Sequence, residues 1–198
     1  MKVCAIRPPN WILLLVAIIP IFSSIPAWAA NPADWKTFTS AGKRNWSVAT
    51  NWTDATGIPT PGSSLVINFD PSRTGTVTAG GKISSPFEVT NDLGTVQLNT
   101  LNLAGESSGT ARTITIRDGI LQFAGDAPAI NNTTTGTVDT VKYVLNNSLL
   151  LDTNLALNLN GTSEMTLLGI SNNTLSASSA GLKTITAFGA GKCILGGN

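Results

Sequence analysis

The sequence has no histidine, and it has few cysteines and few charged side chains. Histidine is the commonest general base and the commonest protein metal ligand, so its absence excludes a serine–histidine triad and any histidine-bound metal. Two cysteines, Cys4 and Cys193, are too few for a disulfide framework. Only 12% of residues are charged, with 12 basic and 11 acidic side chains spread along the chain. Such a balance gives no electrostatic footprint for nucleic acid. We expect a protein that is not an enzyme, holds no cofactor and no metal, and does not bind nucleic acid.

Long apolar runs are also scarce, apart from one at the start of the chain. Lys2 and Arg7 precede the apolar segment Trp11–Phe22, and small residues then end in Ala27-Trp28-Ala29. A positive end, a short apolar run and an A-x-A cleavage site in that order are typical of a secretory signal peptide. We therefore predict that residues 1–29 are a signal peptide and that the protein is secreted or lies on the cell surface.

The alternative for this segment is a membrane anchor, which needs about 20 apolar residues. The run is closed by Asn10 and Ser23 and is interrupted by Pro20. We therefore expect no transmembrane segment in the mature chain. Removing Lys2 and Arg7 leaves 10 basic and 11 acidic residues, a net charge of −1, with Cys193 as the one remaining cysteine.

The remainder is rich in Thr, Asn, Ser and Gly, which are weak helix formers that favour turns. Short runs in which apolar and polar residues alternate recur along it, and each is closed by Gly, Asn or Asp. This pattern predicts an all-β fold of many short strands. The predicted strands are Leu65–Phe69, Thr76–Ala79, Phe87–Thr90, Val96–Leu103, Thr113–Arg117, Ile120–Phe123, Val141–Leu145, Leu149–Asp152, Leu155–Leu159, Met165–Ile170, Thr174–Ala177, Lys183–Ala187 and Cys193–Leu195.

Many short strands are compatible with a parallel β-helix or β-solenoid, and alternatively with an antiparallel β-sandwich. Tight hairpin signals are scarce, since Asn160-Gly161 is the one Asn-Gly pair. Asn and Thr in the turns can stack in ladders along a solenoid. We favour a β-solenoid over residues 63–198. Solenoid repeats begin at about 20 residues, which predicts roughly six coils for residues 65–198.

Residues 30–62 differ from the rest because they hold Trp35, Trp46 and Trp52. We predict an N-terminal cap whose indole rings cover the open end of the solenoid core, because a solenoid needs capped ends. The alternative is a carbohydrate-binding site, in which exposed Trp46 and Trp52 would form a platform for sugar rings. Large aromatic side chains belong to hydrophobic cores more often than they line binding sites, which favours the cap.

Two segments carry a resemblance to a known family. Asn45–Phe69 (NWSVATNWTDATGIPTPGSSLVINF) resembles the opening of exported bacterial proteins with autotransporter-associated β-strand repeats. Gly189–Asn198 (GAGKCILGGN) is similar to the repeat core of that family, with matches at Gly189, Gly191, Leu195 and Gly197. The resemblance implies a right-handed parallel β-helix that serves as a passenger or surface stalk, without catalytic residues. It also implies a truncated or short member of the family.

Two further patterns have a chemical and a structural interpretation. Gly189-Ala190-Gly191-Lys192 resembles a phosphate-binding loop, but Thr186 and Cys193 stand where that motif needs Gly and Ser or Thr, so we predict a turn. Four acids recur at gaps of 13, 13 and 12 and would stack in one column if those gaps matched a coil. We interpret them as solvated turn residues. They are Asp126, Asp139, Asp152 and Glu164.

These patterns favour a secreted or cell-surface structural or adhesive module. The alternatives are a carbohydrate-binding β domain and a β-helix polysaccharide lyase or hydrolase, and the expected partners are surface polysaccharide or other cell-surface components. The strand Cys193–Leu195 is followed by no helix, proline or charged run. We therefore also expect the C-terminal coil to self-associate or fray, because an uncovered strand edge invites pairing.

Overall fold

A computed structural model describes residues 31–38, 43–53, 57–74, 82–83, 86–107, 110–134, 141–160, 162–168, 175–177 and 182–196. The predicted signal peptide lies outside these residues. Almost all regular structure among them is β-strand. The exceptions are the one-turn helix α1 (Pro71–Thr74) and the 3-10 turn η1 (Ala49–Asn51). No helix in the described ranges is both long enough and apolar enough to cross a membrane.

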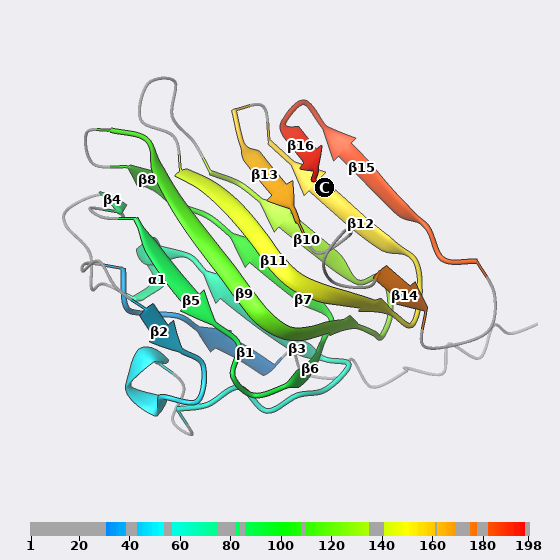
Figure 1. The fold of residues 1–198 in the computed structure, drawn as a ribbon, viewed down its shortest axis with the longest axis horizontal. Helices are drawn as coiled ribbons and strands as arrows, with labels where there is room; N and C mark the ends of the chain where they lie inside the picture. The colour runs from blue at the N-terminus through cyan, green and yellow to red at the C-terminus, as the bar shows by residue number, and fades with distance from the viewer. Residues whose placement is uncertain are drawn as a thin grey trace, which may run out of the picture.

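Two parallel sheets form the body of the molecule (Figure 1). The six-stranded sheet consists, in spatial order, of β1 (Asn31–Asp34), β3 (Leu65–Phe69), β7 (Thr100–Leu103), β10 (Ala129–Asn132), β12 (Leu155–Leu159) and β15 (Ile185–Gly189). The eight-stranded sheet runs through β2 (Lys43–Asn45), β5 (Phe87–Thr90), β9 (Arg112–Phe123), β11 (Val141–Leu151), β13 (Glu164–Leu167) and β16 (Lys192–Leu195), with β6 (Thr95–Leu98) beside β9 and β14 (Leu175–Ala177) beside β11. A small parallel pair joins β4 (Lys82–Ile83) and β8 (Glu106–Ser107).

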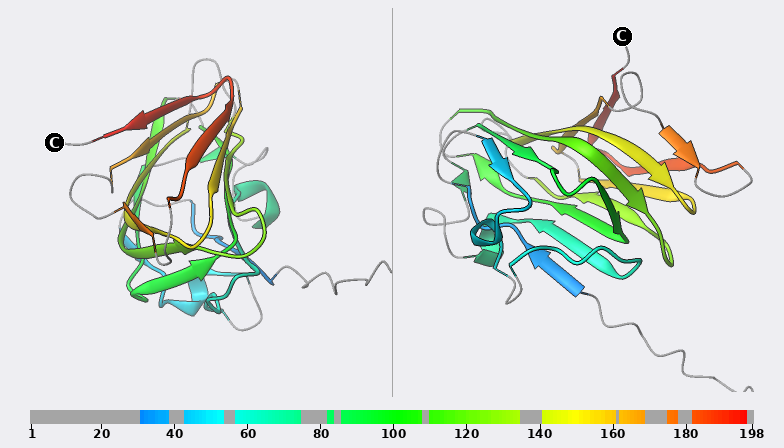
Figure 2. Two further views of the ribbon diagram at one scale, coloured as in Figure 1. Left: turned by 90° about the vertical axis from the view of Figure 1, so that its right-hand side faces the viewer. Right: turned by 60° about the horizontal axis from the view of Figure 1, so that its bottom comes forward.

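The chain passes from one sheet to the other and back, so that each return places a strand beside the equivalent strand of the coil before (Figure 2). Every pairing between the named strands is parallel. In the six-stranded sheet, this register aligns Ala33, Ile67, Leu101, Ile130, Leu157 and Ala187. Equivalent side chains on successive coils of this sheet are therefore separated by 27 to 34 residues of chain.

This arrangement is a β-solenoid, as the alternation and the scarcity of hairpin signals predicted. The antiparallel β-sandwich alternative is wrong, because parallel strands joined by crossovers take the place of hairpins. The predicted coil length of about 20 residues, the lower end of solenoid repeats, was too short. The chain therefore makes fewer coils than predicted over the same segment. The reason is that each coil must supply a strand to both sheets and also the corner segments between them.

Strands with strong alternation were located well. β3, β5 and β12 have the predicted limits, while 96–103 is divided at Asn99 into β6 and β7. The runs 113–117 and 120–123 are two halves of one strand, β9, and β11 unites two predicted runs in the same way. The strands β1, β2 and β10 were missed, because they are short and contain Pro32 or several polar residues. The predicted strand 76–79 lies outside the described residues.

The eight-stranded sheet bends where β9 turns a corner at Asp118 and Gly119. Both residues have positive φ, 61° and 57°. A Cβ atom on Gly119 would lie 2.5 Å from Gly94 O and would also overlap the Asn91 side chain, so only glycine fits there. Beyond the bend, β6, the second half of β9 and the second half of β11 continue the wall around the core.

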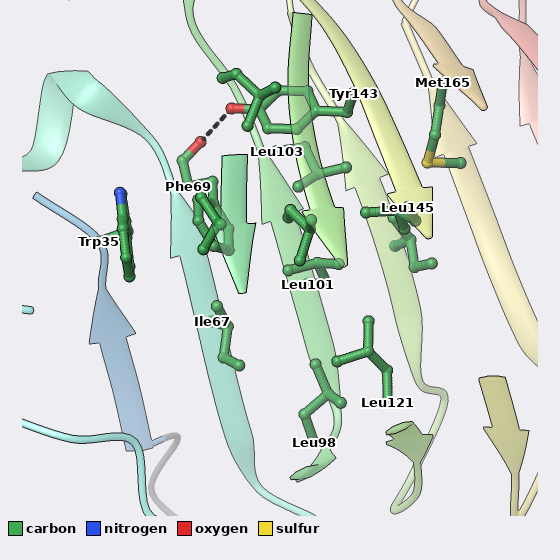
Figure 3. Close-up of a cluster of buried hydrophobic side chains, with 14 of the residues drawn as sticks. Trp35, Ile67, Phe69, Leu98, Leu101, Leu103, Leu121, Tyr143, Leu145 and Met165 are labelled. Atoms are coloured by element: carbon green, nitrogen blue, oxygen red, sulfur yellow. Dashed lines mark hydrogen bonds between the residues drawn. The ribbon is translucent and has the colours of Figure 1, made fainter. Parts of the chain in front are cut away.

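The core consists of columns of apolar side chains that point between the sheets (Figure 3). Alternation along each strand directs every second residue inward, and the parallel register stacks these residues on their equivalents in the next coil. Full burial of each such side chain stabilises the fold by about 1.5–3 kcal/mol. One column contains Val89, Ile116, Leu145 and Leu167, all at most 1% exposed.

The predicted N-terminal cap segment takes part in both sheets. β1 pairs with β3, and β2 pairs with β5, in the same parallel register as the later coils. The strands β1 and β2 of this segment therefore continue the two sheets of the solenoid toward its N-terminal end.

Candidate functional site

The three tryptophans of the first coil form one buried cluster at the N-terminal end of the core. Trp35, Trp46 and Trp52 are each at most 1% exposed. Trp52 packs edge-on against the other two, with ring centroids 5.0 Å from Trp35 and 5.6 Å from Trp46. The ring of Phe69 stacks on that of Trp35 at 5.5 Å. Edge-to-face pairs of this kind add about 0.5–1.5 kcal/mol to the burial of the rings.

Local hydrogen bonds fix two of the three indoles, those of Trp35 and Trp52, in these positions. Trp52 Nε1 donates to the Trp46 carbonyl oxygen over 2.9 Å, and Trp35 Nε1 donates to the Thr37 carbonyl oxygen over 3.0 Å. An antiparallel bridge also joins the backbones of Trp35 and Trp52. The tryptophans of the two Asn-Trp pairs, Trp46 and Trp52, therefore fill the N-terminal end of the core.

The carbohydrate-binding hypothesis needed Trp46 and Trp52 to be exposed and coplanar. Both rings are buried, and their planes meet at 86°. Neither indole presents a face to solvent on which a sugar ring could stack, so the structure does not contain the predicted platform. The physical reason is that large apolar rings gain more from closing the core than from facing water.

A tyrosine spans the core from one sheet to the other. The single phenol O–H of Tyr143, on β11, is shared between two carbonyl oxygens, that of Phe69 at 3.1 Å and that of Ala104 at 2.8 Å (Figure 3 draws the bond to Phe69). Burial removes this phenol from water and raises its pKa well above 10.0. The side chain therefore stays neutral at all ordinary pH values, and its hydrogen bonds link β11 to the backbone at Phe69 and Ala104.

The most regular polar feature is a row of amide side chains along the outside of the six-stranded sheet, which we call the asparagine ladder. Each Nδ2 donates to Oδ1 of the residue one coil earlier, over 2.5 to 2.7 Å. The row ends on the carboxylate of Asp34, which also accepts from Arg73 Nε at 3.0 Å. In order, its members are Asp34, Asn68, Asn102, Asn131 and Asn158.

Asparagines do stack along this solenoid, but the members of the ladder lie within strands and not in the turns where the sequence analysis expected stacking, and they were not identified from the sequence. The available signal was their position. Each ladder asparagine follows an inward apolar residue of its strand, as Asn102 follows Leu101 and Asn158 follows Leu157. An outward position in a parallel sheet lies next to its equivalent in the neighbouring coil, at about 4.8 Å. The repeat has no fixed period, because consecutive ladder residues are separated by 34, 34, 29 and 27 positions.

Further asparagines join coils at the corners. Asn99 Nδ2 donates to the carbonyl oxygens of Ala124 and Asp126, in the next coil. Asn132 is fully buried, and its Nδ2 donates to the Glu164 carbonyl oxygen over 3.2 Å. These bonds link one coil to the next through backbone carbonyl groups.

Charged side chains likewise form contacts between neighbouring coils. Arg117 on β9 bonds to Glu88 on β5, and this contact raises the pKa of the arginine. Glu164 on β13 lies 3.3 Å from Lys142 Nζ and 3.8 Å from Lys192 Nζ, on the strands to either side. These acids and bases therefore hold coils together at the surface.

Of the four acids that recur at nearly equal spacing, the three that the structure describes, Asp126, Asp152 and Glu164, do not form a column. Their spacing is less than half of the 27 to 34 residues that separate equivalent positions on successive coils, so it matches no coil. Asp152 accepts hydrogen bonds from Gln122, whereas Glu164 lies among lysines on β13. Asp126 is exposed in a turn, and Asp139 lies outside the described residues.

Gly189–Lys192 forms the corner between β15 and β16. Gly189 has φ of 92°, and a Cβ atom there would overlap the Leu159 carbonyl oxygen. Gly191 is equally crowded by the Asn160 carbonyl oxygen and Ser163 Oγ. The glycines are therefore required for close stacking of the last coil, and the segment is a turn, as predicted.

Within the described ranges, no three Cys, Asp or Glu side chains come close enough together to hold a metal ion. Comparison with known proteins finds no matching family model, no matching curated protein and no matching solved structure. The geometry of the coils is thus the main guide to function.

Proposed function

We propose that the protein is an exported structural module, a short stiff β-solenoid that presents its surface outside the cell as a stalk or adhesive element and performs no catalysis. The observation that supports this most directly is the asparagine ladder. It joins five neighbouring strands of the six-stranded sheet through one polar side chain from each, and it ends on an ion pair between Asp34 and Arg73.

The contacts of the charged side chains and of the tyrosine support the same function. Glu88, Arg117, Lys142 and Glu164 are engaged between coils, and the Tyr143 phenol is buried and neutral. Stiffness along the stack is the property that such a set of contacts confers.

The sequence supports the extracellular location. The order Lys2 and Arg7, apolar run, and Ala27-Trp28-Ala29 is that of a signal peptide. The resemblance of Asn45–Phe69 and Gly189–Asn198 to autotransporter-associated repeat proteins supports a surface passenger or stalk.

The test combines location with adhesion in the native host. Intact cells are labelled with an antibody to the solenoid, and the released protein is analysed by mass. We expect surface or extracellular material that begins at Ala30 or Asn31. Protein that is exported with Met1 retained would contradict cleavage, and protein found only inside the cell would contradict the proposed location.

Adhesion is measured by comparing the attachment of wild-type cells with that of cells that lack the gene, complemented by the wild type or by Asn102→Ala. We expect attachment to fall without the gene and to return with the wild type. The weakened ladder variant should restore less attachment than a surface control, Thr166→Ala. Turnover of a polysaccharide by the purified protein would instead favour the lyase or hydrolase alternative.

A further inference from the structure

The corner between β12 and β13 combines an exposed asparagine with a main-chain carbonyl oxygen that accepts two hydrogen bonds. Asn160 follows β12 directly and is exposed. Its carbonyl oxygen accepts from Ser163 N over 2.9 Å and from Ser163 Oγ over 2.7 Å. Its main-chain nitrogen donates to the Asn132 carbonyl oxygen over 3.1 Å. The peptide group that follows Asn160 is therefore held at its oxygen, at a residue that water can reach.

The residue after Asn160 is Gly161, and the two form the one Asn-Gly pair of the chain. An asparagine side chain can lose ammonia when the next main-chain nitrogen attacks its Cγ atom. A Cβ atom beside that nitrogen hinders the attack, and glycine is the residue that has none. The sequence therefore places the least hindered nitrogen next to an exposed amide.

The two Ser163 donors favour the first step of this reaction. The Gly161 nitrogen must lose its proton before it attacks, and resonance in the peptide group then places negative charge on the Asn160 carbonyl oxygen. Donors that are already in position where charge develops stabilise that charge without reorganisation. Ser163 is 1% exposed, so little water competes for its hydroxyl group.

We propose that Asn160 is a site of spontaneous deamidation, assisted by the two Ser163 donors, and that its isoaspartate product loosens the corner on which β16 depends. The Gly161 nitrogen gives its proton to water and bonds to Cγ of Asn160. The Cγ–Nδ2 bond breaks, and the side-chain nitrogen takes up a proton and leaves as ammonia. Water then opens the cyclic imide at either carbonyl group. One opening gives aspartate, and the other gives isoaspartate, in which the main chain runs through Cγ.

Other asparagines in the described part of the chain are held differently and serve as internal controls. Asn102 and Asn131 lie in strands, and each donates its Nδ2 to the ladder residue one coil earlier. Asn132 and Asn147 are completely buried. Each of these four is followed by a residue with a side chain. We therefore expect deamidation to be concentrated at Asn160.

The consequence follows from what is attached to this corner. Gly191 N donates to the Leu159 carbonyl oxygen over 3.2 Å, and Lys192 N donates to the Ser163 carbonyl oxygen over 2.8 Å. A Cβ atom on Gly191 would lie 2.5 Å from the Asn160 carbonyl oxygen, so the two corners are in close contact. Isoaspartate adds one methylene to the main chain and converts the carbonyl group that Ser163 holds into a free carboxylate. The support for the start of β16 is thereby weakened.

The experiment incubates the secreted form, from residue 30, at neutral and mildly alkaline pH and follows each asparagine by peptide mass spectrometry. A protein isoaspartyl methyltransferase identifies isoaspartate. Gly161→Ala shields the attacking nitrogen, and Ser163→Ala removes one donor. The matched control is Thr162→Ala, an exposed position in the same corner that leaves both features intact. Circular dichroism establishes that each variant is folded.

We expect Asn160 to deamidate at least tenfold faster than Asn102 or Asn131 in the wild type and in Thr162→Ala. Gly161→Ala should slow the reaction at Asn160 at least tenfold, and Ser163→Ala should slow it severalfold. A wild type in which Asn160 reacts no faster than the other asparagines overturns the proposal. A rate in Ser163→Ala that equals or exceeds that of the wild type also overturns it, because the donors would then give no assistance.

Hydrogen exchange tests the structural consequence. The amides of Gly191 and Lys192 should exchange severalfold faster in the isoaspartate fraction than in unreacted protein. Asn160→Asp, measured when freshly purified, introduces the carboxylate without lengthening the main chain and should leave their protection unchanged. Equal protection in the isoaspartate fraction would contradict the loosening of the corner.

Discussion

Asn131 Nδ2 donates to Asn102 Oδ1 over 2.7 Å, and the two residues are 29 positions apart in the chain. Asn102 in turn donates to Asn68 over 2.7 Å, across 34 positions. The interior amides, Asn68, Asn102 and Asn131, therefore each act as donor and acceptor, and the polarity of the row is the same at every step, toward the carboxylate of Asp34. Aligned hydrogen bonds polarise one another, so an interior member contributes more than a terminal one.

The first prediction concerns the interior of the ladder. Asn102→Ala removes two hydrogen bonds and should lower the free energy of unfolding by about 1–3 kcal/mol. Asn158→Ala removes one bond at the exposed end and should cost less. Urea denaturation measures both, with Thr166→Ala on the outer face of the other sheet as a control. Equal costs for Asn102 and Asn158 would contradict the cooperative ladder.

The second prediction extends the ladder by one coil. Phe188 lies beside Asn158 in the parallel register, and it is 55% exposed at the position where the next asparagine would stand. Phe188→Asn should let the new amide donate to Asn158 Oδ1 and raise the free energy of unfolding by about 0.5–1.5 kcal/mol. Hydrogen exchange at the β15 backbone reports the local effect, and Phe188→Ala separates loss of the ring from gain of the amide. No difference between the two variants would show that β15 does not hold the ladder register.

The third prediction concerns the tryptophan cluster. Trp46→Ala or Trp52→Ala leaves a large cavity at the closed end of the core and should cost about 3–5 kcal/mol. Val48→Ala, at an exposed position nearby, should change stability by less than about 0.5 kcal/mol. Thermal unfolding gives the comparison. The carbohydrate-binding alternative would regain support if both tryptophan variants kept full stability and lost retention on a polysaccharide column.

The fourth prediction uses the single tyrosine of the chain. Burial raises the pKa of Tyr143 in the folded protein well above the value near 10.0 that it has when unfolded. The unfolded chain therefore releases this proton first, and stability is lost as the pH rises above about 10, toward the pKa of the folded state. Tyr143→Phe should remove this alkaline loss, and at neutral pH it should cost about 1–3 kcal/mol, because two carbonyl groups lose their donor.

The measurement is denaturant unfolding at a series of pH values, together with the tyrosinate absorbance of the wild type. An absorbance change that precedes unfolding would mean that the phenol ionises in the folded state, contrary to its complete burial. A variant with the same alkaline loss as the wild type would assign that loss to other groups.

Several levels of this structure follow from local sequence alone. Alternation in Leu65–Phe69 and Leu155–Leu159 determines both the strands and which of their residues face the core, because side chains in a strand point to opposite faces in turn. The glycines at 189 and 191, with the failure of the phosphate-loop spacing, were likewise enough to predict a turn there. The scarcity of hairpin turns was enough to favour parallel coils over a sandwich.

Other levels were decided only by tertiary structure. The length of a coil depends on how many residues the corners between two sheets need, and no local pattern records that number, so the predicted repeat was too short. The stacking of Asn68 on Asp34 and the closing of the core by Trp46 and Trp52 depend on the same register. Sequence determines which way a side chain points, whereas its neighbour one coil away is set by the path of the whole intervening chain.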